Sequence, residues 1–170
     1  GATRVLTDAL FELELDDEAV SVTRRLAARN RKSLPAQALF ARTLARAGIR
    51  DDAALQYKLL SRDVELSHRA LYTIAGAQTD LGALRDASVS LERARRLAPD
   101  ERAYHTATVD IALRLGNVRY ALDEARSLVE RYPESPPVHI LLARAHRRSG
   151  ETDRALESYE TAQALQPDNN

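Results

Sequence analysis

Four histidines are the side chains in this sequence best suited to metal binding or acid–base chemistry. His105 and His139 are 34 residues apart, and His146 follows His139 by seven residues, a spacing that places both on one face of a helix. A metal site needs ligands that converge on one point, usually with cysteine or carboxylate ligands beside the imidazoles, and the chain contains no cysteine. We therefore expect no metal site at these histidines.

Carboxylates are the next candidates for chemistry, and they form two runs, Asp16-Asp17-Glu18 and Asp51-Asp52. Both runs stand where we expect a helix to begin, and carboxylates there stabilise the positive end of the helix dipole. The sequence has no Ser/His/Asp order, no glycine-rich phosphate loop and no H-E-x-x-H pattern. We therefore expect a protein that is not an enzyme and that has no cofactor-binding site.

The elements that must position these residues follow from a period of 34 residues. Glycine, alanine, proline and serine each recur at this spacing: Gly48, Gly82, Gly116 and Gly150; Ala19, Ala53, Ala87, Ala121 and Ala155; Pro99, Pro133 and Pro167; Ser33, Ser67 and Ser135. Four residue types that agree on one period identify an internal repeat. The abundance of Ala, Leu, Arg and Glu, with only 5% aromatic residues, indicates that the repeated elements are helices.

Each recurring residue has a physical role in a unit of two helices. A serine caps the first helix, a glycine closes it where a left-handed or tightly turned residue is needed, and a proline ends the second helix because it lacks an N–H group. The alanine follows the glycine by five residues and marks the point where the two helices approach closely. Apolar spacing predicts the buried faces of one such pair: Ala70, Leu71, Ile74, Ala77 and Gln78, then Ala87, Leu91, Ala94 and Leu97.

These residues resemble the signature of the tetratricopeptide repeat (TPR) family over essentially the whole chain. The last unit matches best, with Leu142, Ala143, Gly150, Ala155, Tyr159, Ala162, Leu165 and Pro167. The first unit is the weakest, because Glu14 stands in place of the glycine and Arg31 in place of the proline. His139 and His146 replace aromatic residues of the family, so the resemblance implies that they pack, partly buried, between paired helices.

The resemblance implies an all-α fold, a right-handed α-solenoid (superhelix) of stacked antiparallel helix pairs. The expected organisation is a single TPR array over 1–170, with repeats at about 1–33, 34–67, 68–101, 102–135 and 136–169. No further helical pattern follows Pro167, and Leu156 is left partly uncovered. We therefore expect a fragment of a longer protein, with self-association through the exposed repeat ends as the alternative.

In the TPR family, ligands lie along a concave groove and contact exposed positions of the first helix of each pair. The residues at those positions are Arg42, Arg46, Arg69, Tyr72, Gly76, Thr79, Asp80, Thr106, Asp110, Leu113, Arg114, Ile140, Arg144, Arg147 and Arg148. Two arginine pairs in this set have a spacing of four residues, so both members of each pair point the same way. Arginine offers paired donors to carboxylate or phosphate groups, which favours an acidic partner. The alternative is a solvated helix face whose arginines pair with nearby Asp and Glu.

One branch of the family holds a terminal carboxylate in a clamp of Lys, Asn and Arg side chains and binds chaperones. The matching positions in this sequence are Ala38, Arg42, Tyr72, Gly76, Thr106 and Asp110. These residues do not form the clamp, so a role as a chaperone co-factor is not expected.

The resemblance implies a non-enzymatic scaffold for protein–protein interaction that binds a partner segment through its concave groove. The alternative is a periplasmic TPR segment of a bacterial exopolysaccharide export or secretion protein, with an anionic polysaccharide as the ligand. A nucleic-acid reader is not expected, because 25 acidic residues balance the 25 basic ones. No apolar run approaches the roughly 20 residues that span a bilayer. The compartment, bacterial cytoplasm or periplasm, stays open.

Overall fold

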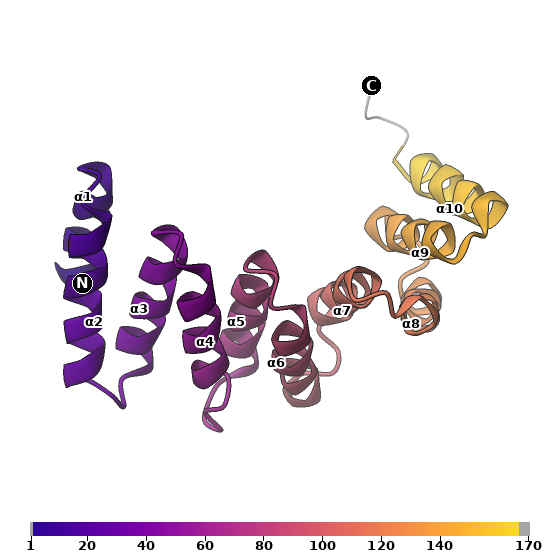
Figure 1. Cartoon of the computed structure of the whole chain (residues 1–170). Helices are drawn as coiled ribbons and strands as arrows, with labels where there is room; N and C mark the ends of the chain where they lie inside the picture. The colour runs from indigo at the N-terminus through magenta and orange to yellow at the C-terminus, as the bar shows by residue number, and fades with distance from the viewer. Residues whose placement is uncertain (1, 167–170) are drawn as a thin grey trace. The chain divides into compact units, whose positions relative to one another are not determined.

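The computed structural model describes residues 2–166, and the regular structure in this part of the chain consists of ten α-helices (Figure 1). Their bounds are α1 Ala2–Glu12, α2 Asp16–Arg29, α3 Leu34–Arg46, α4 Arg50–Leu60, α5 His68–Asp80, α6 Leu84–Leu97, α7 Arg102–Arg114, α8 Val118–Arg131, α9 Pro136–Ser149 and α10 Thr152–Ala164. No helix among the described residues is long and apolar enough to cross a membrane. Two helices fall in each 34-residue period, and the prediction of an all-α fold of helix pairs is confirmed.

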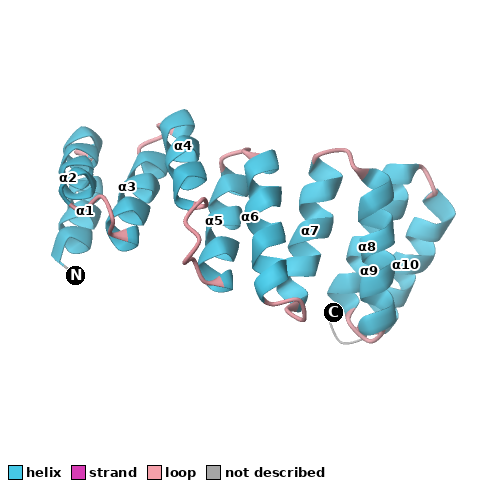
Figure 2. Ribbon diagram, turned by 90° about the horizontal axis from the view of Figure 1, so that it is seen from below, coloured by secondary structure: helices cyan, strands magenta, loops and turns pink. Residues whose placement is uncertain are grey.

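The chain forms two compact units. Unit 1 comprises the residues up to Leu66 together with Gly76–Asp86, and unit 2 comprises Ser67–Ala75 together with the residues from Ala87 onward. In unit 1, α3 packs against α2 and α4, and in unit 2, α9 packs against α8 and α10. Consecutive helices such as α8, α9 and α10 run in opposite directions and are joined by short connections (Figure 2). The helices α7 and α9 also contact each other, so the first helices of two successive repeats are neighbours.

Each unit buries its own apolar side chains, and the recurring alanines are among the buried residues. The side chains of Val20 and Leu44 are 5% and 1% exposed in unit 1. The core of unit 2 contains Val109, Ala112, Leu113, Ala121, Leu122, Ala125, Leu128, Val138, Leu141 and Ala145. The five alanines at the 34-residue spacing are at most 4% exposed, so each is buried, as a position between two packed helices requires. The prediction for Leu97 is wrong: it is 59% exposed, because it is the last residue of α6 and extends past the packed stripe.

The turn inside each helix pair has one hydrogen-bond pattern, which explains the recurring glycine. At the end of α5, the N–H of Gly82 donates to the carbonyl of Thr79 at 3.1 Å, and the N–H of Ala83 donates to the carbonyl of Gln78 at 2.8 Å. This is the Schellman arrangement, and it requires a left-handed residue at the glycine position. Gly82 has a φ of +81°, and the other three recurring glycines have φ values between +76° and +85°. The predicted closure by glycine is confirmed, and of the two conformations expected for it these four glycines adopt the left-handed one.

The first repeat has the same turn without a glycine. Glu14 has a φ of +58°, and its N–H donates to the carbonyl of Phe11 at 3.2 Å. The next N–H, that of Leu15, donates to the carbonyl of Leu10 at 2.9 Å, as in the other four turns. The left-handed region costs a residue with a Cβ roughly 1–2 kcal/mol. The first repeat therefore keeps the backbone of the family signature at an energetic cost that the other repeats avoid.

Serine capping is confirmed at two of the three predicted positions. Ser33 Oγ accepts a hydrogen bond from the N–H of Ala36 at 3.4 Å, and Ser67 Oγ accepts one from the N–H of Ala70 at 3.3 Å. Ser135 makes no such bond, because its hydroxyl accepts instead from Arg102 Nη1 at 3.4 Å. The cap prediction is therefore wrong for Ser135.

The predicted helix-ending prolines lie just beyond the second helix of their pairs. The helix α6 ends two residues before Pro99, and α8 ends two residues before Pro133. Pro167, the third proline in this series, lies outside the described residues. The predicted acidic helix starts are confirmed, because Asp16–Glu18 and Asp51–Asp52 occupy the first turns of α2 and α4.

Candidate partner-binding grooves

The predicted groove residues lie on the first helices of four repeats. Arg42 and Arg46 lie on α3; Arg69, Tyr72, Gly76, Thr79 and Asp80 lie on α5; Thr106, Asp110, Leu113 and Arg114 lie on α7; Ile140, Arg144, Arg147 and Arg148 lie on α9. Most of these side chains are exposed or half-buried, as ligand contact requires. The prediction for Leu113 is wrong: it is 4% exposed, because it points into the core of unit 2.

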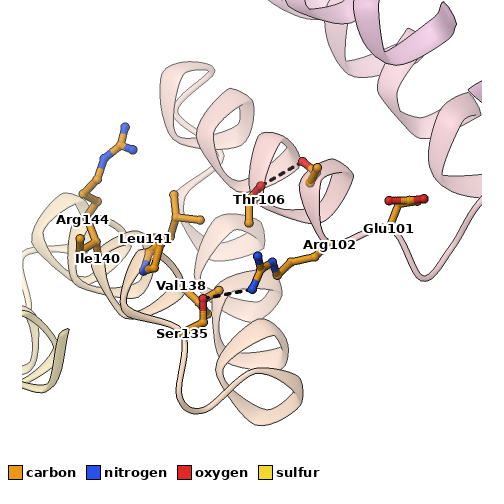
Figure 3. Close-up of a pocket in the computed structure, with 10 residues that line it drawn as sticks. Glu101, Arg102, Thr106, Ser135, Val138, Ile140, Leu141 and Arg144 are labelled. Atoms are coloured by element: carbon orange, nitrogen blue, oxygen red, sulfur yellow. Dashed lines mark hydrogen bonds between the residues drawn. The ribbon is translucent and has the colours of Figure 1, made fainter. Parts of the chain in front are cut away.

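A groove of about 610 Å³ lies in unit 2 between α7 and α9 (Figure 3). It is lined by Glu101, Arg102, Ala103, Thr106, Ser135, Pro137, Val138, Ile140, Leu141 and Arg144. We call it the α7–α9 groove. Three predicted residues, Thr106, Ile140 and Arg144, meet in it, and its volume falls in the range of ligand-binding clefts.

The α7–α9 groove combines an apolar surface with polar groups at its sides. Val138 and Leu141 are buried, whereas Ile140 is 39% exposed and so available for contact. Arg102 reaches across from α7 to the Ser135 hydroxyl (Figure 3). Such a surface can take an apolar side chain of a ligand and hydrogen-bond the chain on either side of it.

Sequence reasoning missed three polar residues of this groove, Glu101, Arg102 and Ser135. They lie at the starts of α7 and α9, one turn before the positions carried over from the family. A signal was available in the repeat itself, because Thr106 and Ile140 share one register, 34 residues apart. The residue one helix turn before Thr106 is Arg102, so the same comparison of repeats, extended by one turn, identifies it as a groove residue.

Two of the predicted arginines, Arg144 and Arg148, are already engaged within unit 2. Arg144 Nη2 forms an ion pair with Asp110 at 2.6 Å, and both side chains are about one-third exposed or slightly more. Arg148 Nη2 donates to the main-chain carbonyl of Leu113 at 3.3 Å. These bonds reduce the positive charge that this part of the chain offers to a ligand. At Arg144 the ion pair agrees with the alternative interpretation of these arginines, a solvated helix face on which they pair with nearby Asp and Glu.

Aromatic side chains form a cluster on α5 and α7 within unit 2. The rings of Tyr72 and Tyr104 lie 4.8 Å apart between centroids, and the Tyr104 hydroxyl is 2.7 Å from His68 Nδ1. Burial raises the pKa of Tyr104; Glu101 raises it further, and Arg69 lowers it. Tyr72 is 38% exposed, so one ring of the pair is available to a ligand.

A second hollow, of about 230 Å³, lies in unit 1 between α1 and α3. It is lined by Arg4, Thr7, Asp8, Phe11, Arg42, Thr43 and Arg46. We call it the α1–α3 pocket. It brings the two predicted arginines together with Arg4, Asp8 and Phe11, which sequence reasoning missed. Arg46 Nη1 forms an ion pair with Asp8 Oδ1 at 3.1 Å, and the Arg46 guanidinium lies 4.2 Å from the centre of the Phe11 ring.

The histidines are packing residues, as predicted. His105, His139 and His146 are between 5% and 8% exposed. In two successive repeats the ring donates from Nε2 to a proline carbonyl: His105 to Pro99 at 2.7 Å and His139 to Pro133 at 2.6 Å. Among residues 2–166, no group of three or more His, Cys, Asp or Glu side chains could hold a metal ion.

Comparison with known proteins gives one family and a set of similar folds. The family described as the bacterial transcriptional activator domain matches residues 77–168. A protein described as a kinesin light chain of Podosopora anserina, with nearly identical TPR-like repeats, aligns with a TM-score of 0.75 at 18% identity, over 99% of this chain and 96% of that chain. MamA aligns with a TM-score of 0.73 at 15% identity, over 98% and 91% of the two chains. A search of curated proteins finds no match.

A third solved structure, YrrB, is described as a TPR protein with an unusual peptide-binding site. It aligns with a TM-score of 0.69 at 15% identity, over 96% of this chain and 84% of that chain. At such low sequence identities the similarity shows the fold, and it does not transfer the function of these proteins to this chain. The resemblance to TPR proteins is confirmed by these folds. Since the family match covers more than half of the sequence, the chain belongs to the bacterial transcriptional activator domain family, and its fold is that of tetratricopeptide repeats.

Proposed function

We propose that this chain is a non-enzymatic protein-binding module of a bacterial transcriptional regulator, and that it takes up a segment of a partner protein in the α7–α9 groove. The observation that carries the proposal is the groove itself, with exposed Ile140 beside the polar side chains of Arg102, Ser135 and Thr106. The family name supports the transcriptional setting. That setting corresponds to the bacterial cytoplasm, one of the two compartments left open by the sequence.

The partner contact is proposed for the first helices of the repeats. Arg69 and Tyr72 on α5, Thr106, Asp110 and Arg114 on α7, and Ile140, Arg144, Arg147 and Arg148 on α9 form the proposed contact set in unit 2. Arg42 and Arg46 belong to the set in unit 1. Balanced net charge supports a protein partner over nucleic acid, because phosphate backbones require an excess of cations.

The lining of the α7–α9 groove supports a partner segment of mixed character. Glu101 opposes the positive charge of Arg102, and Arg144 is held by Asp110. An apolar anchor residue flanked by hydrogen-bonding groups therefore fits this groove better than a run of acidic residues. The exopolysaccharide alternative gains no support here, because a polyanion would face Glu101 and Asp110 as well as the arginines.

Site-specific photo-crosslinking in the native bacterium tests the proposal. A photoreactive residue at Ile140 lies in the groove, and the same residue at Val89, which is 57% exposed on α6, is the control. We expect Ile140 to crosslink one protein of the transcription apparatus, and Val89 to give no such product. Equal yields from both positions, or an envelope export protein or polysaccharide captured at Ile140, would contradict the proposal.

Loss of binding then locates the contact. Ile140→Glu places a charge on the exposed apolar surface, and we expect it to abolish crosslinking from a neighbouring groove position such as Thr106. Val89→Glu introduces a charge at an exposed apolar side chain of α6 that does not line the groove, and it should leave the yield unaltered.

A further inference from the structure

The helix α1 has an apolar side that is open to solvent. Val5, Leu6 and Leu13 are 70%, 49% and 68% exposed, and Ala2 and Ala9 are exposed beside them. Leu13 continues the helical pattern, because its N–H donates to the carbonyl of Ala9 at 3.1 Å. At 3.6 residues per turn these five residues share one side of the helix, and none of them is charged. We call them the α1 face.

The opposite side of α1 is already used within unit 1. Thr7 is 3% exposed and packs inward. The α1 residues that line the α1–α3 pocket lie on that side as well: Arg4, Thr7, Asp8 and Phe11. A contact made through the α1 face therefore leaves the packing of unit 1 and the α1–α3 pocket as they are.

The positions of the α1 face are packed in the last repeat. Val5 and Ala9 lie four 34-residue periods before Leu141 and Ala145 of α9. Leu141 is 8% exposed and Ala145 is 0% exposed, and both belong to one core cluster with Ala125 of α8. In α9 this side therefore packs against the helix that precedes it. In the described part of the chain, α1 packs against α2, and the same side stays open. An apolar helix is thus the kind of element that the α1 face fits.

The exposed side of α10 does not offer such a helix, because it is acidic. Leu156 is 58% exposed, and the exposed Asp153, Glu157 and Glu160 are its neighbours on the helix surface. If α10 of a second copy packed on the α1 face, these carboxylates would be buried against apolar side chains. Burying an unpaired charge costs free energy, so a head-to-tail contact between α1 and α10 is disfavoured.

The exposed side of α4 is also interrupted by charge. Leu55 and Leu59 are 51% and 48% exposed, and the charged Asp51, Asp52 and Lys58 are exposed on the same helix. The α1 face differs because all five of its residues are apolar. A second α1 face therefore covers the first without burying a charged group.

We propose that the chain forms a symmetric dimer in which the α1 faces of two copies pack against each other in antiparallel orientation. Val5, Ala9 and Leu13 are spaced by four residues and form one ridge along the helix. A two-fold axis at Ala9 places Val5 against the partner's Leu13, and the small Ala9 lets the two helices approach closely. Both copies then use the same surface, as a two-fold interface requires.

The charge beside the α1 face favours the antiparallel orientation. Glu12 is exposed at the edge of the face. In a parallel pair the two Glu12 side chains would lie at the same level, where like charges repel. In the antiparallel pair they lie at opposite ends of the contact. The dimer contact uses residues of unit 1 alone and does not depend on the function proposed for the α7–α9 groove.

Sedimentation equilibrium of the purified chain tests the dimer. One helix face makes a small interface, so we expect a weak dimer with a dissociation constant on the order of 10–100 µM. Val5→Glu should raise this constant at least about tenfold, because it places a charge from each copy in the apolar contact. Val64→Glu is the matched control, since Val64 is 87% exposed in the connection between α4 and α5, and it should leave the constant unchanged. Circular dichroism checks that both variants keep the helical fold.

Disulfide crosslinking tests the orientation, because the chain contains no cysteine of its own. Ala9→Cys should crosslink to itself under mild oxidation, since the two-fold axis passes beside it. Val5→Cys alone should not crosslink: in the antiparallel pair the two Val5 positions are about 12 Å apart along the helices, beyond the reach of a disulfide. A mixture of Val5→Cys and Leu13→Cys chains should crosslink to each other.

A chain that remains monomeric at about 500 µM would overturn the proposal, and so would equal weakening of the dimer by Val5→Glu and Val64→Glu. Self-crosslinking of Val5→Cys would show a parallel contact, and crosslinking of Ala9→Cys with Leu156→Cys would show a head-to-tail contact; either result would overturn it too. Photo-crosslinking from Ile140 should be the same in the Val5→Glu variant as in the unaltered chain. This comparison separates a failure of the dimer from a failure of the proposed function.

Discussion

Replacing two glycines of unit 1 by alanine should change stability in opposite directions. Gly76 lies inside α5 at an ordinary helical φ, whereas Gly82 lies six residues later in the turn with a φ of +81°. A Cβ atom added at either position would meet no heavy atom within 4 Å. Steric clash with the rest of the protein is therefore absent at both sites, and only the backbone conformation distinguishes them.

The expected magnitudes follow from that difference. Gly76→Ala should stabilise the fold by about 0.5–1 kcal/mol, because alanine loses less backbone entropy in a helix than glycine does. At Gly82, the left-handed conformation costs alanine about 1–2 kcal/mol, and the smaller entropy of the unfolded chain returns about 0.4–1 kcal/mol. Gly82→Ala should thus destabilise by about 1 kcal/mol, and the two variants should differ by about 2 kcal/mol.

Urea unfolding followed by circular dichroism measures both free energies, with the midpoint and slope fitted for each variant. The two residues belong to one unit, so any independent unfolding of the units affects both in the same way. A Gly82→Ala variant that is as stable as the unaltered chain would refute the assignment of strain to the left-handed turn. So would two variants that shift together.

Three further outcomes are expected. Glu14→Gly should raise the free energy of unfolding by up to about 1 kcal/mol in the same urea assay. Glu14 adopts a left-handed backbone conformation in the turn between α1 and α2, and glycine adopts that conformation without the steric cost of a Cβ atom. Leu128→Ala should cost about 2–5 kcal/mol, since Leu128 is 1% exposed, while Leu156→Ala, at a position that is 58% exposed, should stay within about 0.5 kcal/mol. Burial raises the pKa of Tyr104, so the fold keeps the phenol proton where the unfolded chain releases it. Its contribution to stability should be intact below about pH 10 and lost as the pH rises further, and Tyr104→Phe should reduce this alkaline loss in unfolding titrations.

The helix pairs could be predicted because their positions depend on local chemistry. A glycine that must adopt positive φ and a proline that cannot donate a hydrogen bond mark the ends of helices without reference to the rest of the fold. Ser135 shows the limit of this reasoning. Its hydroxyl had two possible partners, and the choice of Arg102 depends on a side chain 33 residues away.

The binding surfaces could be predicted only as helix faces. The sequence placed Arg144 and Asp110 on exposed positions but did not reveal that they bind each other. Both lie in one register, 34 residues apart, so opposite charges at equal positions of successive first helices indicate a contact. Arg46 and Asp8 are 38 residues apart and follow no such rule, because their meeting depends on side-chain length and on the Phe11 ring.

The turn at Glu14 shows how a repeat can diverge while its architecture persists. The family match begins at residue 77, whereas turns of the same geometry occur at Glu14 and Gly48, well before it. A signature residue can thus be exchanged for about 1–2 kcal/mol, an amount that a packed core can absorb. Each turn is consequently a place where evolution can introduce a charged side chain without rebuilding the helices on either side.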